Sequence, residues 1–149
     1  MSKIGLIGAS TRVGAFVKIL KSKFSGKHTI AGIMDCDPGK MKGFCEVHEL
    51  QVPCYTDFDL FCKEVAPDTV IISTVDATHA EYVVKCLDRK ISCIVEKPLC
   101  ISLEQCREKG INESMIHEDF MIGNETLSIV GVCRDGSCVQ IFKDGEWAF

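Results

Sequence analysis

The sequence DTVIISTVDATHAEYVVKCLDRKISCIVEKP, residues 68–98, decides the fold of this chain. A β-branched apolar run ends at Thr74, a stretch with helical spacing follows, and a second apolar run ends just before Lys97. Continuous runs of this kind predict strands that are covered on both faces of a sheet. Such a strand–helix–strand unit brings the carboxyl ends of its strands to one sheet edge, where open α/β sheets bind ligands.

The residues before this unit repeat the same alternation. Apolar runs at residues 3–7 and 29–34 predict two strands, with a helical stripe between them and a less regular helix over about 40–47. Residues 52–55 predict a brief third strand that Pro53 restricts to an edge. The pattern predicts an α/β fold with a doubly wound, mainly parallel Rossmann-type sheet and a short antiparallel β tail.

Three sequence signals predict where later helices begin. Asp57 is the expected N-cap of a helix that follows it. Thr78 and Glu81 match a capping box, and an S-x-x-Q box at Ser102 predicts a short helix that ends near Gly110. We therefore expect a dinucleotide-binding domain over residues 1–110.

The remaining residues, 111–149, have a different character. Residues 111–126 show no clear period and indicate a linker. Two β-type runs then flank Asp135-Gly136, a dipeptide typical of tight hairpins. The sequence predicts a linker followed by a β-hairpin or meander.

Composition narrows the class of protein. Seventeen Lys and Arg against 21 Asp and Glu give a formal charge of −4, and no basic cluster predicts a nucleic-acid partner. The start of the chain has no secretory pattern, and no apolar run approaches the ~18 residues of a membrane span. Ten cysteines without a C-x-x-C pair indicate reduced packing thiols rather than a metal site. We expect a cytoplasmic protein without membrane contact.

The stretch GASTRVG, residues 8–14, is the candidate anion-binding turn. Glycine lets backbone approach a pyrophosphate, and the following helix N-terminus supplies N–H groups and positive dipole. A G-x-G-x-x-G alignment puts Ser10 and Val13 at its second and third glycines, whereas a G-x-x-G-x-x-G alignment has Thr11 at its middle one. A tight turn that binds nothing is the structural alternative.

Asp35 closes the second predicted strand, 27 residues after Gly8. An acid at this place accepts hydrogen bonds from adenosine ribose hydroxyls. Its charge repels a 2′-phosphate, so it favours NAD over NADP. Asp37 is the competing acid, and Arg12 is a candidate phosphate ligand. The structural alternative is an Asx turn before Pro38.

Lys97 is the candidate catalytic residue. An ammonium at the carboxyl end of a strand binds a substrate hydroxyl or carbonyl and assists proton transfer. Glu96 is expected to hold it by charge, and a solvated salt bridge is the alternative. His79 is a second candidate acid, but its place in the first turn of a helix favours capping or packing.

Together these residues resemble the N-terminal half of the Gfo/Idh/MocA oxidoreductases over residues 2–109. The likeness is carried by KIGLIGAS at residues 3–10, DCDP at 35–38, YTDF at 55–58, IIST at 71–74 and VEKPL at 95–99. The resemblance implies a Rossmann domain that binds NAD(P), with Lys97 near the nicotinamide and the substrate. It implies that the cofactor cleft is lined by Gly8, Ser10, Asp35, Thr74, His79, Glu96 and Lys97, and Thr11 and Arg12 of the glycine turn are added as candidates.

The resemblance also implies a second domain with a large open sheet, most of which this sequence lacks. The predicted tail hairpin resembles the closing strands of that sheet, so we expect a shortened relative. The expected activity is hydride transfer between NAD(P) and a sugar or polyol. One alternative is an inactive cofactor-binding sensor or regulatory subunit, and another is a form that binds nothing. Association of identical chains through the β tail is expected.

Overall fold

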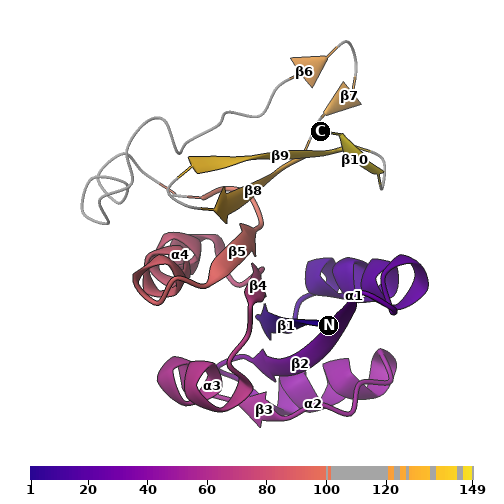
Figure 1. Ribbon diagram of the computed structural model, residues 1–149, viewed down its shortest axis with the longest axis vertical. Helices are drawn as coiled ribbons and strands as arrows, with labels where there is room; N and C mark the ends of the chain where they lie inside the picture. Colours follow the sequence, from indigo (N-terminus) through magenta and orange to yellow (C-terminus); the bar gives the residue numbers. More distant parts are fainter. Residues whose placement is uncertain are drawn as a thin grey trace. The chain divides into compact units, whose positions relative to one another are not determined.

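The computed structural model describes residues 1–99 and 101 and, in the tail, only the strands given below. The chain forms two compact units, Met1–Thr74 and Val75–Phe149, and each is described by itself (Figure 1). The predicted division at residue 110 stays a prediction. The helix predicted from Ser102 lies outside the described residues.

The first unit alternates strands and helices around a parallel sheet. Its elements are β1 (Ser2–Ile7), α1 (Thr11–Lys23), β2 (His28–Met34), α2 (Pro38–Val47), β3 (Cys54–Tyr55), α3 (Phe58–Val65) and β4 (Thr69–Ile72). Every strand pair in it is parallel, and the strand order is β4-β1-β2-β3. The prediction of parallel βαβ units is confirmed, and β3 is the short edge strand that Pro53 indicated.

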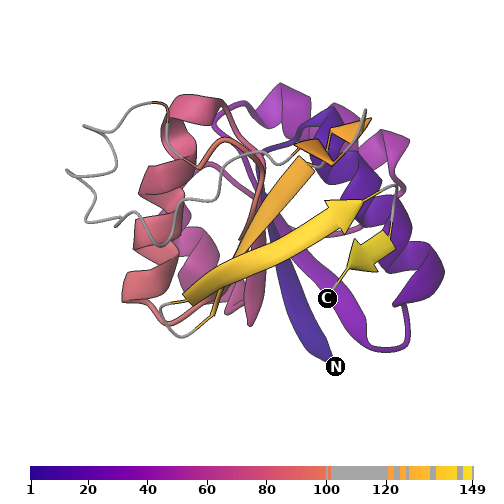
Figure 2. The same ribbon diagram turned by 90° about the horizontal axis from the view of Figure 1, so that it is seen from above.

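Helices cover both faces of this sheet. α1 and α2 lie on one face and α3 on the other (Figures 1 and 2). Right-handed crossovers require this, because the chain moves outward from β1 to β3 and then returns to β4. The core between the layers holds fully buried side chains from both sides: Leu6, Ile7, Val13, Val17, Ile33, Phe61, Val70 and Ile72. The sheet is thus doubly wound, as predicted.

Two aspartates begin helices in this unit. The Asp57 carboxylate accepts the Leu60 N–H at 2.7 Å, which confirms the predicted cap of α3. The Asp37 carboxylate accepts the Lys40 N–H at 3.0 Å, and Pro38 occupies the first turn of α2. α2 therefore begins two residues earlier than the pattern predicted, because proline fits a first helical position.

The second unit begins with helix and continues as antiparallel sheet. Its elements are η1 (Asp76–Thr78), α4 (His79–Asp88), β5 (Ser92–Val95), β8 (Ser128–Arg134), β9 (Ser137–Lys143) and β10 (Glu146–Ala148), in the sheet order β10-β9-β8-β5. The pairs β5–β8, β8–β9 and β9–β10 are all antiparallel. A separate pair joins β6 (Met121–Ile122) to β7 (Glu125–Thr126).

The capping box predicted at Thr78 is wrong. Thr78 closes the 3₁₀ turn η1, and its hydroxyl donates to the Val75 carbonyl at 2.9 Å instead of capping α4. Glu81 instead lies 2.6 Å from Lys85 in an i,i+4 ion pair. The turn before the helix satisfies the hydroxyl, so the pattern alone does not form the box.

Gly14 lets α1 pack closely against the end of α2. A Cβ at this position would lie 2.5 Å from Nε2 of His48, the C-cap residue of α2. Gly14 is buried inside α1, after the turn. This glycine therefore allows the two helices to pack closely.

His48 is expected to make stability depend on pH. Burial, and then the positive charges of Lys18 and Lys21, lower the pKa of His48. The unfolded chain, with a His pKa of about 6.5, then binds the proton more readily, so stability falls as the pH drops below that value. We expect thermal unfolding scans to show this loss, and to show a smaller loss in His48→Gln. If Tm falls with decreasing pH equally in the wild type and in His48→Gln, His48 is not the cause of the pH dependence.

Candidate functional site

The glycine turn joins the carboxyl end of β1 to α1. Gly8 has a φ of +96°, and its N–H donates to the Met34 carbonyl at 2.8 Å. A Cβ here would lie 2.4 Å from the Ser73 carbonyl oxygen and 3.1 Å from the Thr74 nitrogen. Glycine is required because the turn is pressed against the residues that follow β4. Gly8 and Thr74, both predicted site residues, are therefore neighbours.

Ser10 completes the turn and begins α1. Its Oγ accepts the Val13 N–H at 3.2 Å and lies 2.8 Å from Ser73 Oγ. Thr11 and Arg12, which are exposed, form the first turn of α1, and this turn holds no acidic residue. The helix N-terminus thus keeps its positive dipole, while Ser10 occupies the space that a second glycine would leave open.

Asp35 connects the end of β2 to the glycine turn. Its Oδ2 accepts the Ala9 N–H at 2.7 Å, and its Oδ1 accepts the Asp37 N–H at 3.0 Å. Burial raises the pKa of Asp35, but these backbone hydrogen bonds and the charge of Lys40 outweigh it and hold the pKa below its ordinary value. Asp35 is therefore an ionised carboxylate although it is buried.

The two competing acids have different roles. Asp37 is exposed and caps α2 with its carboxylate. Asp35 makes the expected Asx turn through Oδ1, but its Oδ2 faces the glycine turn. The geometry favours Asp35 as the acid of a nucleotide site.

These residues fit the adenosine and phosphate part of a dinucleotide. An ionised carboxylate accepts ribose hydroxyls, and a helix N-terminus without acids binds phosphate. One group stands in the way: Lys40 Nζ is 3.5 Å from Asp35 Oδ2, and the Asp35 side chain is only 8% exposed. Lys40 must move aside to admit a ribose, and its own side chain is half exposed, which allows this.

The second unit holds the other predicted site residues. His79 is buried, and its Nδ1 lies 2.8 Å from the Pro98 carbonyl oxygen. A carbonyl only accepts, so Nδ1 carries the proton and, in the neutral ring, Nε2 is an acceptor. Glu96 is buried and Lys97 is exposed, and the Lys97–Pro98 peptide bond is cis. His79 therefore holds the segment that carries Lys97, the packing role that its position predicted.

The structure brings Gly8, Ser10, Asp35 and Thr74 together in the first unit, with Thr11 and Arg12 in the adjoining helix turn. His79 and the Glu96–Pro98 segment meet in the second unit. Sequence reasoning missed Ser73 and Lys40. Ser73 closes a strand whose end was expected at the site, and that is its only signal, whereas the ion pair of Lys40 with Asp35 has none.

None of the helices in the described part of the chain is long and apolar enough to cross a membrane. Among the same residues, no group of three or more His, Cys, Asp or Glu is placed to hold a metal ion. The described groups are suited to nucleotide binding and proton transfer.

Residues 2–110 match the model of a family described as an oxidoreductase family with an NAD-binding Rossmann fold. The putative oxidoreductase YteT of Bacillus subtilis is 33% identical over 111 residues, which cover 70% of this chain and 26% of that protein. A solved scyllo-inositol dehydrogenase from Lactobacillus casei, with bound NAD(H) and scyllo-inositol, has a TM-score of 0.63 at 16% identity and covers 73% of this chain and 32% of its own. At this identity the structural likeness shows the fold.

Residues 91–147 match a different family model, that of the thermophilic metalloproteases (M29). Aminopeptidase 2 of Geobacillus stearothermophilus is 44% identical over 55 residues, which cover 37% of this chain and 13% of that enzyme. The predicted origin of the tail, a remnant of the oxidoreductases' second domain, stays a prediction beside this similarity. The chain spans about a third or less of the length of each of these relatives.

The first match covers well over half of the chain and includes the whole parallel sheet of the first unit, the glycine turn and Asp35. It also includes His79, Glu96 and Lys97. The resemblance inferred from the sequence is confirmed. The chain belongs to the Gfo/Idh/MocA family of oxidoreductases, and the matched part is the family's NAD-binding Rossmann fold.

Proposed function

We propose that the protein binds NAD and transfers a hydride between NAD and a sugar or polyol. The observation that carries the proposal is the buried, ionised Asp35 carboxylate at the end of β2, in contact with the glycine turn. Its charge opposes a 2′-phosphate, which favours NAD over NADP. The solved relative that holds NAD(H) and scyllo-inositol supports both the cofactor and the class of substrate.

Lys97 is the proposed proton acceptor and donor. Bound NAD would take the hydride from the substrate carbon. In this direction Lys97 accepts the proton of the substrate hydroxyl; in reverse it returns a proton to the carbonyl oxygen. Buried Glu96 precedes Lys97, and the His79 N–H holds the carbonyl of Pro98 after it. Both neighbours restrict the backbone that presents the amine.

Cofactor binding is expected to raise the thermal unfolding temperature. A ligand at 100 times its Kd stabilises the folded state by about 2.7 kcal/mol. We expect NAD to raise Tm and NADP to raise it less at equal concentration. If neither NAD nor NADP raises Tm, the proposal is contradicted and the alternative, a form of the protein that binds nothing, is favoured.

Replacement of Lys97 tests the chemistry. In Lys97→Ala, kcat on a responsive polyol is expected to fall by about 10²- to 10⁴-fold, the usual contribution of a positioned acid–base group. The Kd for NAD is expected to stay unchanged. Lys63→Ala, which removes an exposed lysine from α3, is the control. Equal turnover in wild type and Lys97→Ala would exclude the assigned role.

We further propose a cytoplasmic protein that does not bind nucleic acid and that self-associates through its tail. Within the second unit, β10 is the last strand of the sheet order, and strand edges of this kind pair with other chains. Light scattering of the intact chain tests this, since a monomer would contradict it. If NAD binds and no sugar or polyol is turned over, the sensor or regulatory alternative replaces the enzyme.

The tail favours a second candidate function. Residues 91–147 resemble part of a metalloprotease family, so peptide hydrolysis is the alternative activity. Among the described residues, no group of three or more His, Cys, Asp or Glu could hold the metal ion of such a protease. Hydrolysis of aminoacyl p-nitroanilides with added Zn²⁺ or Co²⁺ discriminates the two: the oxidoreductase proposal expects none.

A further inference from the structure

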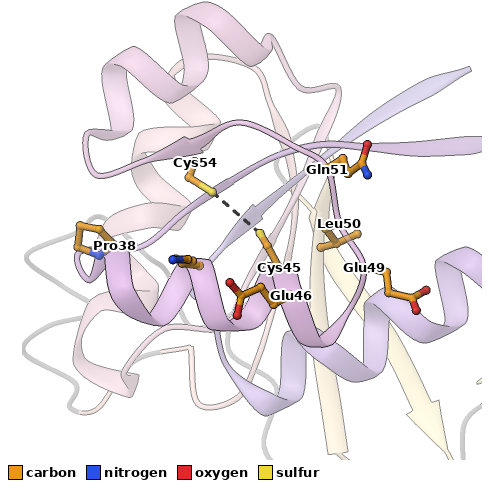
Figure 3. Close-up of a pocket in the computed structure, with 8 residues that line it drawn as sticks. Pro38, Cys45, Glu46, Glu49, Leu50, Gln51 and Cys54 are labelled. Atoms are coloured by element: carbon orange, nitrogen blue, oxygen red, sulfur yellow. Dashed lines mark hydrogen bonds between the residues drawn. The ribbon is translucent and has the colours of Figure 1, made fainter.

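Cys45 and Cys54 bring two free thiols together at the surface of the first unit. Cys45 lies on α2 and Cys54 begins β3, and their Sγ atoms are 4.0 Å apart. Figure 3 shows the two sulfurs directed toward one another from the helix and the strand. A disulfide bond measures about 2.05 Å. The remaining gap is about 2 Å, a distance that rotation of two short side chains can close.

The two thiols differ in their surroundings. Cys54 is exposed and Cys45 is half-buried. Cys54 Sγ lies 3.8 Å from the Val52 carbonyl, which only accepts, so the Cys54 thiol donates there and the Cys45 thiol donates to Cys54. Burial, and then the charge of an ionised Cys54, raise the pKa of Cys45 to about 11. Cys54 is thus the accessible nucleophile, and Cys45 is a protonated thiol behind it.

We propose that Cys54 is a modification site for small-molecule disulfides, and that Cys45 resolves the adduct into a Cys45–Cys54 disulfide. This thiol chemistry is separate from NAD binding and does not depend on it.

The reaction is two successive thiol–disulfide exchanges. Cys54 loses its proton to solvent, and its thiolate attacks one sulfur of the small disulfide RSSR, so a Cys54–SR bond forms, the original S–S bond breaks and RS⁻ leaves. Cys45 loses its proton to solvent and attacks Cys54 Sγ, which expels the second RS⁻. Both thiolates take up protons from water. Two cysteine thiols are oxidised to one disulfide, and RSSR is reduced to two RSH.

A pocket beside the pair can admit the reagent. It has a volume of about 460 Å³ and is lined by both cysteines together with Lys42, Glu46 and Glu49. Small-molecule sites have volumes of about 300–1,000 Å³. One ammonium and two carboxylates disfavour an anionic disulfide, so the expected class is a neutral or cationic one. The neutral probe is bis(2-hydroxyethyl) disulfide.

The test uses the full chain, reduced and then exposed to the probe. Samples are quenched over time by alkylation, digested and mapped by mass spectrometry. We expect a peptide pair joined through Cys45 and Cys54, preceded by a hydroxyethyl adduct on Cys54 that disappears as the cross-link forms. The proposal is overturned if the probe modifies the exposed Cys36 while Cys45 and Cys54 are both recovered fully alkylated.

Single substitutions separate the two roles. In Cys45→Ser the adduct on Cys54 is expected to persist instead of being transient, and Cys45→Ala provides the same test if the serine variant folds poorly. In Cys54→Ser neither adduct nor cross-link is expected at Cys45. Cys36→Ser, which removes another exposed thiol, is the control and is expected to cross-link like the wild type. A transient adduct in Cys45→Ser would show that Cys45 is not the resolving thiol and would refute the mechanism.

Discussion

Gly8→Ala is expected to lower the free energy of unfolding by about 3 kcal/mol, the upper end of the cost of a strained backbone in a residue other than glycine. Gly8 has a positive φ, and an added Cβ would lie 2.4 Å from the Ser73 oxygen and 2.8 Å from its carbonyl carbon. These are backbone atoms, so only a shift of the chain after β4 relieves the contact. Urea unfolding of the variant and the wild type measures the difference.

The matched control for this prediction is Gly26→Ala. A Cβ at Gly26 meets no atom within 4 Å, and its φ lies outside the positive range. We expect a change within about 0.5 kcal/mol, as for other surface substitutions. If both variants lose the same stability, the cost does not arise from the contact with Ser73. NAD is also expected to stabilise Gly8→Ala less than the wild type, because the turn can no longer keep its shape.

Asp35→Asn is expected to weaken NAD binding by about 10- to 100-fold, the range set by losing a hydrogen bond to a charged group. It also removes the charge that disfavours a 2′-phosphate, so the preference for NAD over NADP should narrow or reverse. In the wild type the two carboxylate oxygens accept from the backbone N–H groups of Ala9 and Asp37. The single side-chain oxygen of asparagine cannot take the place of both. Calorimetric titration with each nucleotide measures the affinities.

Two further aspartates make this test specific. Asp57→Asn changes the N-cap of α3, away from the glycine turn, and should leave both affinities unchanged. Asp37→Asn separates the competing acids, because asparagine caps a helix as well as aspartate does. A loss of NAD affinity in Asp37→Asn and not in Asp35→Asn would show that the acid was assigned wrongly.

Asp35 also predicts the response to acid. Its pKa is held below the ordinary value, so its contribution to stability is present above about pH 3.8 and is lost as the pH falls through the folded-state pKa. Asp35→Asn has no such group. The wild type is therefore expected to lose its advantage over the variant on acidification, which unfolding measurements across that range can follow.

Much of the first unit follows from local sequence patterns. The strands are apolar runs and most of the helices have a regular apolar period, and Asp57 stands where a cap is needed. The sequence also located Asp35, because an acid at the end of a second strand has a known use. Thr78 shows the limit of such patterns. A capping box needs an N-cap residue with extended backbone, whereas Thr78 ends a 3₁₀ turn and has helical backbone angles.

Contacts between distant residues were not predictable. The role of Gly14 depends on His48, which reaches it only after two crossovers have placed α1 and α2 on one face. The thiol pair likewise has no motif, because Cys45 and Cys54 meet through the pairing of β3 with β2 and the packing of α2 beside it. The similarity of residues 91–147 to a metalloprotease family was not predicted, because short strands carry little information about ancestry.

The hydrogen bond between Ser10 and Ser73 can run in either direction. Ser10 Oγ already accepts from Val13, and either hydroxyl can donate across the 2.8 Å gap between them. When Ser73 donates, the Ser10 O–H no longer has to point at Ser73, and in the proposed nucleotide site it would donate to a phosphate oxygen. Rotation of two O–H bonds, without displacement of any heavy atom, would thus let the proposed site gain a side-chain donor that a glycine at this position could not supply.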